Sequence, residues 1–402
     1  MSEIRERAEQ SRGKKAAFGR DLNLEDFSRQ GGAWEYDPDY RQLSPEERRR
    51  LLTTGIELTD EDHAGTFLQA DEAIVHCQTR QPGVEVLPIT EAASRHDWVH
   101  DLLWGLVAVD ADKYTAAAEL ELDNGYFIRA LEGAQIAQPV ESCLYIRSDR
   151  FAQHAHNLVV VEEGASLHII TGCATHPGVI SGLHIGVSEF YVRAGGKLTF
   201  TMVHNWGEEV HVRPRTAVMV EAGGTYISNY LLLRPVRSVQ MYPTVTLNGE
   251  GAVARMQSIL IAHPGCELDG GGRVILKAPH TRAEVIARTL AIGGYSIARG
   301  HLVGLVPDIK AHLECRGLIM GNGVVYAIPE LEGRAAGVDM SHEAAVGKIA
   351  AEEVEYLMAR GLDEEEAVST IVRGFLNVKI EGLPPALEQE MEQAIQASGQ
   401  GM

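Results

Sequence analysis

The chain has 402 residues, enough to bury a sizeable core in two or three domains or in one long solenoid with appendages. Its 36 Lys and Arg residues against 56 Asp and Glu residues leave a net charge of −20, which repels the phosphates of nucleic acids and of anionic lipids. No apolar run is long enough for a membrane helix and the first residues are charged, so we expect a cytoplasmic protein without nucleic-acid or membrane partners.

The cysteines, of which there are five, are far apart in the sequence, and no Cys-x-x-Cys pair occurs. An odd number of isolated cysteines excludes a disulfide framework and a zinc site made of cysteines alone within one chain. A bound metal cluster would therefore need other ligands, or a second chain, to complete its coordination. The five are Cys77, Cys143, Cys173, Cys266 and Cys315.

The N-terminal third of the chain has mixed patterns. Residues 1–30 are charged with sparse apolar positions, which predicts an N-terminal helix or, preferably, a solvated arm. In residues 31–139, Ser44 before a proline marks a helix start, residues 73–78 are strand-like and residues 97–109 are helix-like. We predict a small N-terminal α/β domain over residues 31–139.

Residues 140–330 carry a repeat. Short runs rich in Val, Ile, Thr, Tyr and Leu recur, each closed by a glycine turn; the first three intervals between turns are 31, 28 and 26 residues, and a further turn fits at 269–271. Strands and glycine turns at this period are typical of a β-solenoid, so we predict a mainly β fold with a right-handed parallel β-helix core; the alternative is an antiparallel sandwich. The turn glycines are Gly164, Gly195, Gly223, Gly249 and Gly293.

Residues 331–402 are predicted to form a C-terminal helical domain. Residues 352–360 carry apolar side chains on one face, Asp363 and Glu366 form a capping box for a second helix, and the prolines at 384–385 open a third. The helices are short and their faces are apolar. We therefore expect them to dock on the solenoid, on another protein, or on both.

Candidates for chemistry lie near the end of the repeat. Cys315 is in a strand-like run, and His342 and Glu343 follow Ser341 at an expected helix start. A thiol, an imidazole and a carboxylate within thirty residues could hold a metal or a cluster loosely. Taken singly, a packed core thiol and a solvated helix start are the simpler interpretations. Cys173 lies in a bend after a strand, where a thiol could be reactive or merely packed.

Enzyme motifs are scarce. A β-helix suits polysaccharide lyases and hydrolases, which need paired carboxylates or acidic calcium ligands. Only two aspartates, Asp269 and Asp308, occur between residues 151 and 330, which disfavours a carbohydrate-active enzyme. Neither a phosphate-binding loop nor a nucleophile elbow is present. His154 and His156 share one face of a strand, but no third metal ligand is evident and surface histidines are the simpler interpretation.

Several longer motifs are recognisable together. They are G-C-A-T-H-P-G (172–178), H-N-W-G (204–207), R-T-L-A-I-G-G-Y-S-I-A-R-G (288–300), E-C-R-G-L-I-M-G (314–321) and S-H-E-A-A-V-G-K-I with Y-L-M-A-R-G (341–361). In this order they resemble the SufB/SufD family, the scaffold proteins of the SUF iron–sulfur cluster assembly system. The resemblance covers about residues 140–383 and implies a parallel β-helix core between an N-terminal domain and a C-terminal helical domain.

The resemblance also implies metal ligands. In the SufB branch, the cysteine matching Cys315 and the glutamate matching Glu343 hold the nascent iron–sulfur cluster, with the histidine matching His342 nearby. In the SufD branch, the histidine is the important residue and the glutamate is usually glycine. Because this chain has all three, the resemblance favours a SufB-type scaffold working as a homodimer. A SufD-like structural subunit, paired with a different SufB chain, is the alternative.

Further roles and partners are implied in the same way. Cys173 would receive sulfur from a cysteine desulfurase or sulfur carrier near Asn205 and Trp206; His204 stands where SufB proteins tend to have Gln. A SufC-type ABC ATPase would supply ATP hydrolysis, so this chain would be a scaffold for a transient cluster and not itself an enzyme. The ATPase would dock on the C-terminal helices, at Glu352, Tyr356, Leu357, Arg360 and Phe375.

Overall fold

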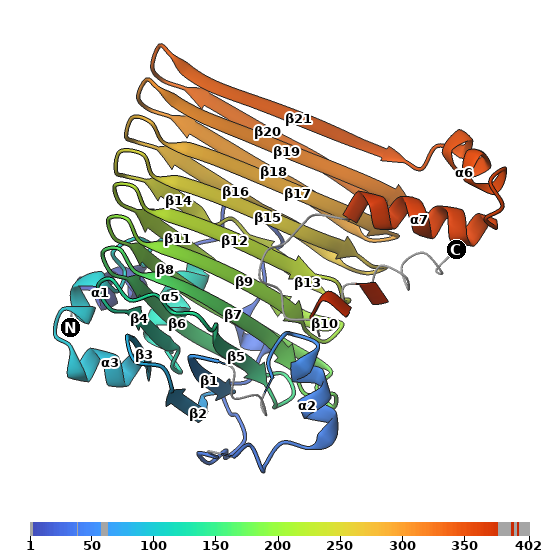
Figure 1. Ribbon diagram of the computed structural model, residues 1–402. Coiled ribbons are helices and arrows are strands. Elements are labelled where there is room, and N and C mark those ends of the chain that lie inside the picture. The colour runs from blue at the N-terminus through green and yellow to red at the C-terminus, as the bar shows by residue number, and fades with distance from the viewer. Residues whose placement is uncertain (1–2, 38, 58–62, 377–386, 390–391, 394–402) are drawn as a thin grey trace.

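The structure is a computed structural model that describes residues 3–37, 39–57, 63–376, 387–389 and 392–393. The chain winds into a stack of coils whose strands form two facing sheets (Figure 1). This confirms the predicted mainly β fold with a parallel β-helix core and excludes the antiparallel sandwich. In the described ranges, no helix is long and apolar enough to cross a membrane.

Counted over the described residues, the first sheet has ten strands and the second has eleven. The ten-stranded sheet contains, in spatial order, β2 (Ala73–Thr79), β1 (Gly65–Ala70), β5 (Val140–Ile146), β7 (Ser166–Thr175), β9 (Lys197–Asn205), β12 (Thr225–Leu232), β15 (Val253–Ala262), β17 (Arg282–Ile292), β19 (Ile309–Met320) and β21 (Val338–Lys348). The eleven-stranded sheet contains β10 (Glu209–Val212), β13 (Ser238–Met241), β16 (Glu267–Leu276), β14 (Thr244–Leu247), β11 (Arg215–Val220), β8 (Ser181–Val192), β6 (Ala152–Val161), β4 (Tyr126–Ala130) and β3 (Val84–Pro88), while β18 (Tyr295–Gly304) pairs with β16 and β20 (Val324–Gly333) pairs with β18.

Parallel pairing in register stacks the side chains in columns. Each residue of β17, from Arg282 to Ile292, lies beside the residue of β19 that is 28 positions later in the chain. Because successive side chains of a strand alternate between its faces, a column lies either between the two sheets or on an outer surface. The inward columns are apolar and form one continuous core along the stack, in which the rings of Phe190 and Phe200 pack edge to face at 4.8 Å.

Left-handed residues make the turns that join the coils. Gly164, Gly195 and Gly223 have φ of +65°, +63° and +64°, a region that favours glycine. The N–H of Gly195 donates to the carbonyl of Ala222 in the next coil at 2.8 Å, and the other two glycines donate to the following coil in the same manner. The next turn uses Gly251 rather than the predicted Gly249.

The predicted turn at residues 269–271 is wrong, because these residues lie inside β16. The glycines at these positions are required by close packing against the neighbouring strand, not by a turn. A Cβ on Gly271 would lie 2.3 Å from the backbone oxygen of Arg299 on the neighbouring strand. The turn before β16 is made by Gly265, with φ of +82°.

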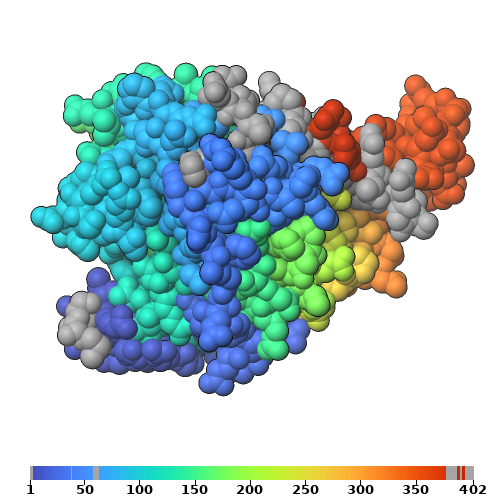
Figure 2. Space-filling view, turned by 90° about the horizontal axis from the view of Figure 1, so that it is seen from below, coloured from blue at the N-terminus to red at the C-terminus, as the bar shows by residue number. Residues whose placement is uncertain are grey.

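The N-terminal region covers the first coil, and its described strands join the two sheets of the β-helix. Strand β1 pairs in parallel with β5, and β4 pairs in parallel with β6, so residues 31–139 extend both sheets of the β-helix. Figure 2 shows these residues covering that end of the molecule. The helices of this region are α2 (Pro45–Leu52), α3 (Ile89–Arg95), α4 (Val99–Leu102) and α5 (Lys113–Leu120).

Residues 3–30 form a docked arm rather than the expected solvated one. Helix α1 (Glu3–Gln10) packs on α5 through the buried Ala8, and a short 3₁₀ helix, η1 (Leu24–Asp26), lies farther along the arm. Arg7 reinforces the contact with an ion pair to Asp110 at 2.8 Å. The arm was misjudged because its apolar positions are few, although Ala8 and Leu22 are buried and Leu24 and Phe27 pack against buried residues.

At the C-terminal end, the β-helix continues beyond residue 330 to Lys348. Ser341 therefore lies in a strand, and the expected helix start there is wrong. The reason is that β21 is an edge strand with exposed side chains on both faces, so its sequence lacks the alternation by which strands are recognised. Helices α6 (Ala351–Met358) and α7 (Glu364–Leu376) follow.

Helix α7 packs on the outer face of the ten-stranded sheet. Its residues Val368 and Val372 contact an apolar patch that includes Ile259, Leu290 and Leu318. The predicted capping box at Asp363 is confirmed, because its side chain accepts from the amide of residue 366 at 2.8 Å and its amide donates to the side chain of residue 366 at 3.1 Å. The predicted third helix begins at residues 384–385, outside the described residues.

Candidate functional site

Cys315 lies near the open end of the β-helix, on β19. Its side chain faces inward and is fully buried. In its column it is flanked by Ala287 on β17 and Ala344 on β21, so its neighbours along the stack are two methyl groups. Burial raises the pKa of the Cys315 thiol to about 11, so the thiol is protonated at neutral pH. Binding a metal there would release this proton.

His342 and Glu343 lie on β21, the strand beside Cys315. His342 pairs with Leu313 and Glu343 pairs with Glu314. Since paired residues of parallel strands share a face, His342 lies on the inward side with Leu313 and Cys315, whereas Glu343 lies on the outer side. Both side chains are exposed because β21 is the last strand of its sheet.

The carboxylate of Glu343 belongs to a row of charges on the outer face. Its Oε1 accepts from Arg316 Nη2 at 2.6 Å, and Arg316 Nε lies 3.3 Å from Glu314 Oε1. Glu314 is also bonded to Arg288, whose guanidinium lies 6.0 Å from the ring of Phe375 on α7. This charge row thus runs from β21 to the edge of the α7 footprint.

The sequence analysis did not single out the two arginines of the charge row. The only available signal was that Arg288 and Arg316 are 28 residues apart, the length of one coil. Stacking at that interval places the two arginines side by side. Because their positive charges repel each other, neighbouring carboxylates are needed to neutralise them. Glu314 and Glu343 meet that requirement.

The three predicted ligands do not converge within one chain. Among the described residues, no three His, Cys, Asp or Glu side chains gather closely enough to hold a metal ion. Cys315 and His342 share the inward side of two adjacent strands, and Glu343 faces away from them. Their common role as ligands stays a prediction.

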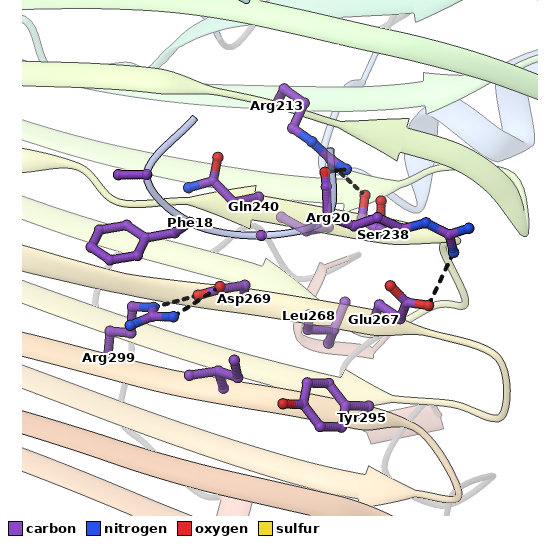
Figure 3. Close-up of a pocket in the computed structure, with 14 residues that line it drawn as sticks. Phe18, Arg20, Arg213, Ser238, Gln240, Glu267, Leu268, Asp269, Tyr295 and Arg299 are labelled. Carbon is purple, nitrogen blue, oxygen red and sulfur yellow. Dashed lines mark hydrogen bonds and ion pairs between the residues drawn. The ribbon is translucent and has the colours of Figure 1, made fainter. Parts of the chain in front are cut away.

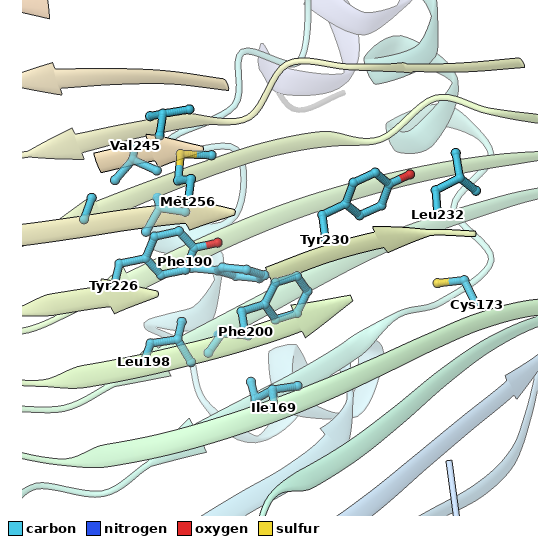
Figure 4. Close-up of a cluster of buried hydrophobic side chains, with 14 of the residues drawn as sticks. Ile169, Cys173, Phe190, Leu198, Phe200, Tyr226, Tyr230, Leu232, Val245 and Met256 are labelled. Atoms are coloured by element: carbon cyan, nitrogen blue, oxygen red, sulfur yellow. The ribbon is translucent and has the colours of Figure 1, made fainter. Parts of the chain in front are cut away.

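Cys173 lies on β7, far from the open end, and is also fully buried (Figure 4). Burial raises the pKa of its thiol above the ordinary value. Its partner on β9 is His204, whose Nδ1 lies 2.9 Å from the hydroxyl of Tyr230. The ring of Trp206 lies 5.5 Å from His204 and 5.0 Å from His184. Burial lowers the pKa of both histidines, that of His184 to about 3, so both rings are neutral.

Asn205 and Trp206 line a surface cleft of about 620 Å³ beside helix α2. Asn205 Nδ2 donates to Thr53 Oγ1 at 2.6 Å, and Arg50 Nη2 donates to the backbone oxygens of Asn205 and Trp206 at 3.3 and 3.1 Å. Trp206 therefore has one side toward this cleft and the other in the aromatic cluster next to Cys173. Other ionisable residues around the cleft are Glu46, Arg49, His176, Glu208, Glu209 and Arg234.

The two buried thiols face the same interior. Between β7 and β19 lie four strands, which at the usual spacing puts Cys173 and Cys315 roughly 24 Å apart along the stack. The column of Cys315 continues through Ala287 and Ser258 to Tyr230, the residue bonded to His204. A cavity of about 40 Å³ lies along this column, lined by Tyr230, Ser258 and Ala287.

Glycines of the opposite sheet keep that cavity open. Gly270 and Gly272 of β16 face Leu260 and Met256 across the interior. A Cβ on Gly272 would lie 2.8 Å from Met256 Cε, and one on Gly270 would lie 3.4 Å from Leu260 Cδ1. Side chains at these two positions would therefore fill the space between the sheets.

The predicted docking residues for an ATPase lie on α6 and α7. Glu352, Tyr356 and Arg360 are exposed, while Leu357 and Phe375 are half-buried. Arg360 lies over the Tyr356 ring at 4.7 Å. Helix α6 has no buried residue and projects from the β-helix (Figure 1). Docking of another protein on this helix stays a prediction.

His154 and His156 are buried, so the expectation of surface histidines was wrong. His156 Nε2 lies 2.8 Å from the fully buried Glu189 carboxylate. That carboxylate also accepts the backbone amides of residues 104, 106 and 107 at 2.6, 2.6 and 2.9 Å. This pair holds the loop after α4 on the eleven-stranded sheet and has a structural role.

Comparison with known proteins places these features in context. The family model described as "SUF system FeS cluster assembly, SufBD core domain" matches residues 144–375. An iron–sulfur cluster assembly SufBD family protein of Methanothermobacter thermautotrophicus is 46% identical over 404 residues, covering 98% of both chains. One from Archaeoglobus fulgidus is 47% identical over 363 residues, covering 90% of this chain and 97% of the relative. The assembly protein SufB of Bacillus subtilis is 28% identical over 349 residues, covering 84% of this chain and 74% of that protein.

Proposed function

Because the chain belongs to the SufBD family of iron–sulfur cluster assembly proteins, we propose that it is a SufB-type scaffold on which iron–sulfur clusters are built before transfer to other proteins. The cluster is cargo, held briefly between two chains in the cytoplasm. In this proposal the chain is not itself an enzyme, and ATP hydrolysis belongs to a SufC-type partner.

The main observation that supports the proposal is that Cys315 lies on the strand next to the last one, β21. Strand β21 bears His342 and Glu343 and, in the described part of the chain, pairs only with β19. Its unpaired edge invites a strand from a second chain. Two chains meeting there bring two sets of sulfur, nitrogen and oxygen ligands to one seam. Such mixed ligands hold iron less firmly than four thiolates, which suits a cluster that must leave.

The surface of the last coil supports this interface. Five large apolar side chains are exposed on β20 and β21, which is unusual for a surface that stays in water. A second copy would cover them at the same time as it pairs with the edge strand. These side chains are Val324, Tyr326, Ile328, Leu331 and Val346.

Sulfur enters at the other end of the interior. A desulfurase or sulfur carrier would occupy the cleft beside Asn205 and Trp206 and present a persulfide to Cys173. The thiol would attack the terminal sulfur: an S–S bond forms at Cys173, the donor's S–S bond breaks, and the donor leaves as a thiol. The proton of Cys173 passes to the departing sulfur of the donor, so the exchange needs no separate base. The column through Tyr230 and the small cavity then leads toward Cys315.

The ATPase acts through the C-terminal helices. A SufC-type subunit bound to α6 would move α7 against the ten-stranded sheet. Because Arg288 lies against Phe375 and begins the charge row that ends at Glu343, such movement would loosen Glu343 and free it for iron. The same residues would then connect nucleotide-driven motion with the ligand seam.

A SufD-like structural subunit is the second candidate. Two observations favour it: Cys315 is fully buried, and Glu343 is already engaged by Arg316. In that case the chain would pair with a different SufB chain and hold no cluster by its own thiol.

Anaerobic reconstitution with iron and sulfide separates the two candidates. The scaffold predicts that Cys315→Ser lowers the iron and sulfide bound per chain, while Cys77→Ser, a cysteine remote from the seam, binds as much as the parent. Equal cluster content in the parent and in Cys315→Ser contradicts the scaffold. Retention of a SufC-type ATPase on the parent but not on Tyr356→Ala would support the docking surface.

A further inference from the structure

A pocket of about 320 Å³ lies away from the candidate site, between the N-terminal arm and the outer face of the eleven-stranded sheet (Figure 3). Its volume is at the small end of the range for pockets that bind small molecules. Residues 17–20 of the arm form one wall. The floor is made by outward side chains of β13, β16 and β18: Gln240, Glu267, Asp269, Tyr295, Ile297 and Arg299.

The arm is fixed over this floor by specific contacts. Gly19 has φ of +76°, and a Cβ there would lie 2.3 Å from Gln240 Cγ, so only glycine lets the arm cross so closely. The ring of Phe18 lies 4.2 Å from the guanidinium of Arg299. Arg20 Nη1 donates to Glu267 Oε1 at 3.2 Å. The arm therefore forms this wall of the pocket through its own contacts with the sheet and needs no ligand to do so.

The charges around the pocket do not cancel. Arg299 is bonded twice to Asp269, at 2.6 and 3.0 Å, and Arg20 pairs with Glu267. Arg213 is the third arginine; it is 1% exposed, and within the described residues it forms no ion pair with a carboxylate. The pocket thus has one excess positive charge in a chain whose net charge is −20.

Two buried polar atoms at the pocket also have no partner in the described residues. Arg213 donates through Nη1 to Val212 O at 2.9 Å and through Nη2 to Arg20 O at 3.1 Å, but its Nε makes no hydrogen bond. The Oε1 of Gln240, a residue only 5% exposed, likewise accepts none. A buried guanidinium without a counter-charge and a buried carbonyl without a donor are both costly unless a ligand satisfies them.

We propose that this pocket binds a small organic anion with a single negative charge. Its carboxylate, or a group of equal charge, pairs with Arg213, and a hydroxyl or amine on it donates to Gln240 Oε1. A flat apolar body lies against Tyr295 and Ile297. The bound molecule would join the arm to three strands of the sheet. Neither the cluster ligands nor the cleft beside Trp206 is involved.

The test uses the full chain and two matched probes, 4-hydroxybenzoate and 4-hydroxybenzamide, which differ in charge but little in shape. Titration calorimetry and ligand-observed NMR measure their binding. We expect the benzoate to bind at least about tenfold more tightly, because only it can pair with Arg213. Arg213→Met is the obvious variant, but the side chain also bonds the backbone and its loss could prevent folding.

Ile297→Trp therefore serves as the decisive variant, since it fills the floor and leaves Arg213 in place. Its matched control is Ile275→Trp, which faces the same side of the neighbouring strand β16 and does not line the pocket. We expect Ile297→Trp to weaken benzoate binding by about tenfold or more and Ile275→Trp to leave it unchanged. Equal affinity for the two probes, equal effects of the two variants, or no binding at up to about 10 mM benzoate would each overturn the proposal.

Discussion

Cys315 and Glu343 lie on neighbouring strands and face opposite sides of one sheet. The thiol is enclosed between the two sheets, and the carboxylate is bonded to Arg316 on the outer surface. A cluster held by both must therefore bridge the edge of β21, where the inner and outer faces meet. This geometry leads to the first prediction.

Arg316→Met should make Glu343 more available to iron. Removing the guanidinium frees the carboxylate, so we expect anaerobic titration to show Fe(II) binding a few-fold tighter in the variant. Because both side chains are well exposed, the free energy of unfolding should change by less than about 1 kcal/mol. The matched control is Arg255→Met, which breaks an exposed pair with Glu284 on the same face. Weaker iron binding in Arg316→Met than in the control would show that the arginine supports the ligand instead of restraining it.

The buried thiol of Cys315 should make the stability of the metal-free chain fall at alkaline pH. Its pKa is about 11 in the folded chain against an ordinary value of 9.0, so between these pH values only the unfolded chain releases the proton. The contribution to stability is complete below pH 9.0 and is lost as the pH rises toward 11. Urea unfolding of Cys315→Ala at pH 8, 9 and 10 should show a shallower decline than the parent. Parallel curves would mean that this thiol does not titrate as described.

Loss of the Glu189 carboxylate should destabilise the fold strongly. It is fully buried and accepts three backbone amides besides His156. We expect Glu189→Gln to lower the free energy of unfolding by about 2–4 kcal/mol, since bonds to a buried charged acceptor are lost. Glu221→Gln, which removes a half-buried pair with Arg193, should cost less than about 1 kcal/mol. Denaturant unfolding of both variants measures the difference, and similar costs would contradict the role assigned to burial.

Filling the interior cavity should block sulfur transfer without preventing cluster binding. Gly272→Leu would place a side chain against Met256, inside the cavity between Cys173 and Cys315. With labelled sulfur supplied by a desulfurase, we expect less label to appear in the cluster. Reconstitution with free sulfide should be nearly unchanged, and this serves as the internal control. If both routes decline together, the substitution has damaged the fold or the seam, and if neither declines, sulfur follows another path.

Much of the fold could be predicted because its turns require a backbone conformation that favours glycine. Residues such as Gly164, Gly195 and Gly223 must adopt positive φ once per coil, and this requirement leaves a visible period in the sequence. The last coil was missed because its edge strand lacks a partner on one side and so needs no alternation. The docked arm was missed for a similar reason, since a few small contacts, such as that of Ala8, hold it.

The sequence could not predict on which side of the sheet each candidate ligand lies. That side depends on the length of each coil, and successive coils differ by one residue. From β17 to β19 the offset between paired residues is 28, whereas from β19 to β21 it is 29. At an offset of 28, Cys315 would pair with Glu343 on the inward side; at 29 it pairs with Ala344. A one-residue change in a turn exchanges the two faces of a strand, and no sequence motif records it.

The two ends of the β-helix are unlike: residues 31–139 cover the first coil, and the last coil presents its bare edge (Figures 1 and 2). In the proposed homodimer, two such rods would join by the edge strands of their last coils, and their N-terminal ends would point away from each other. That arrangement would pair the exposed edge of β21 with its counterpart and leave it unavailable for further strand pairing, the process by which proteins rich in strands grow into fibres.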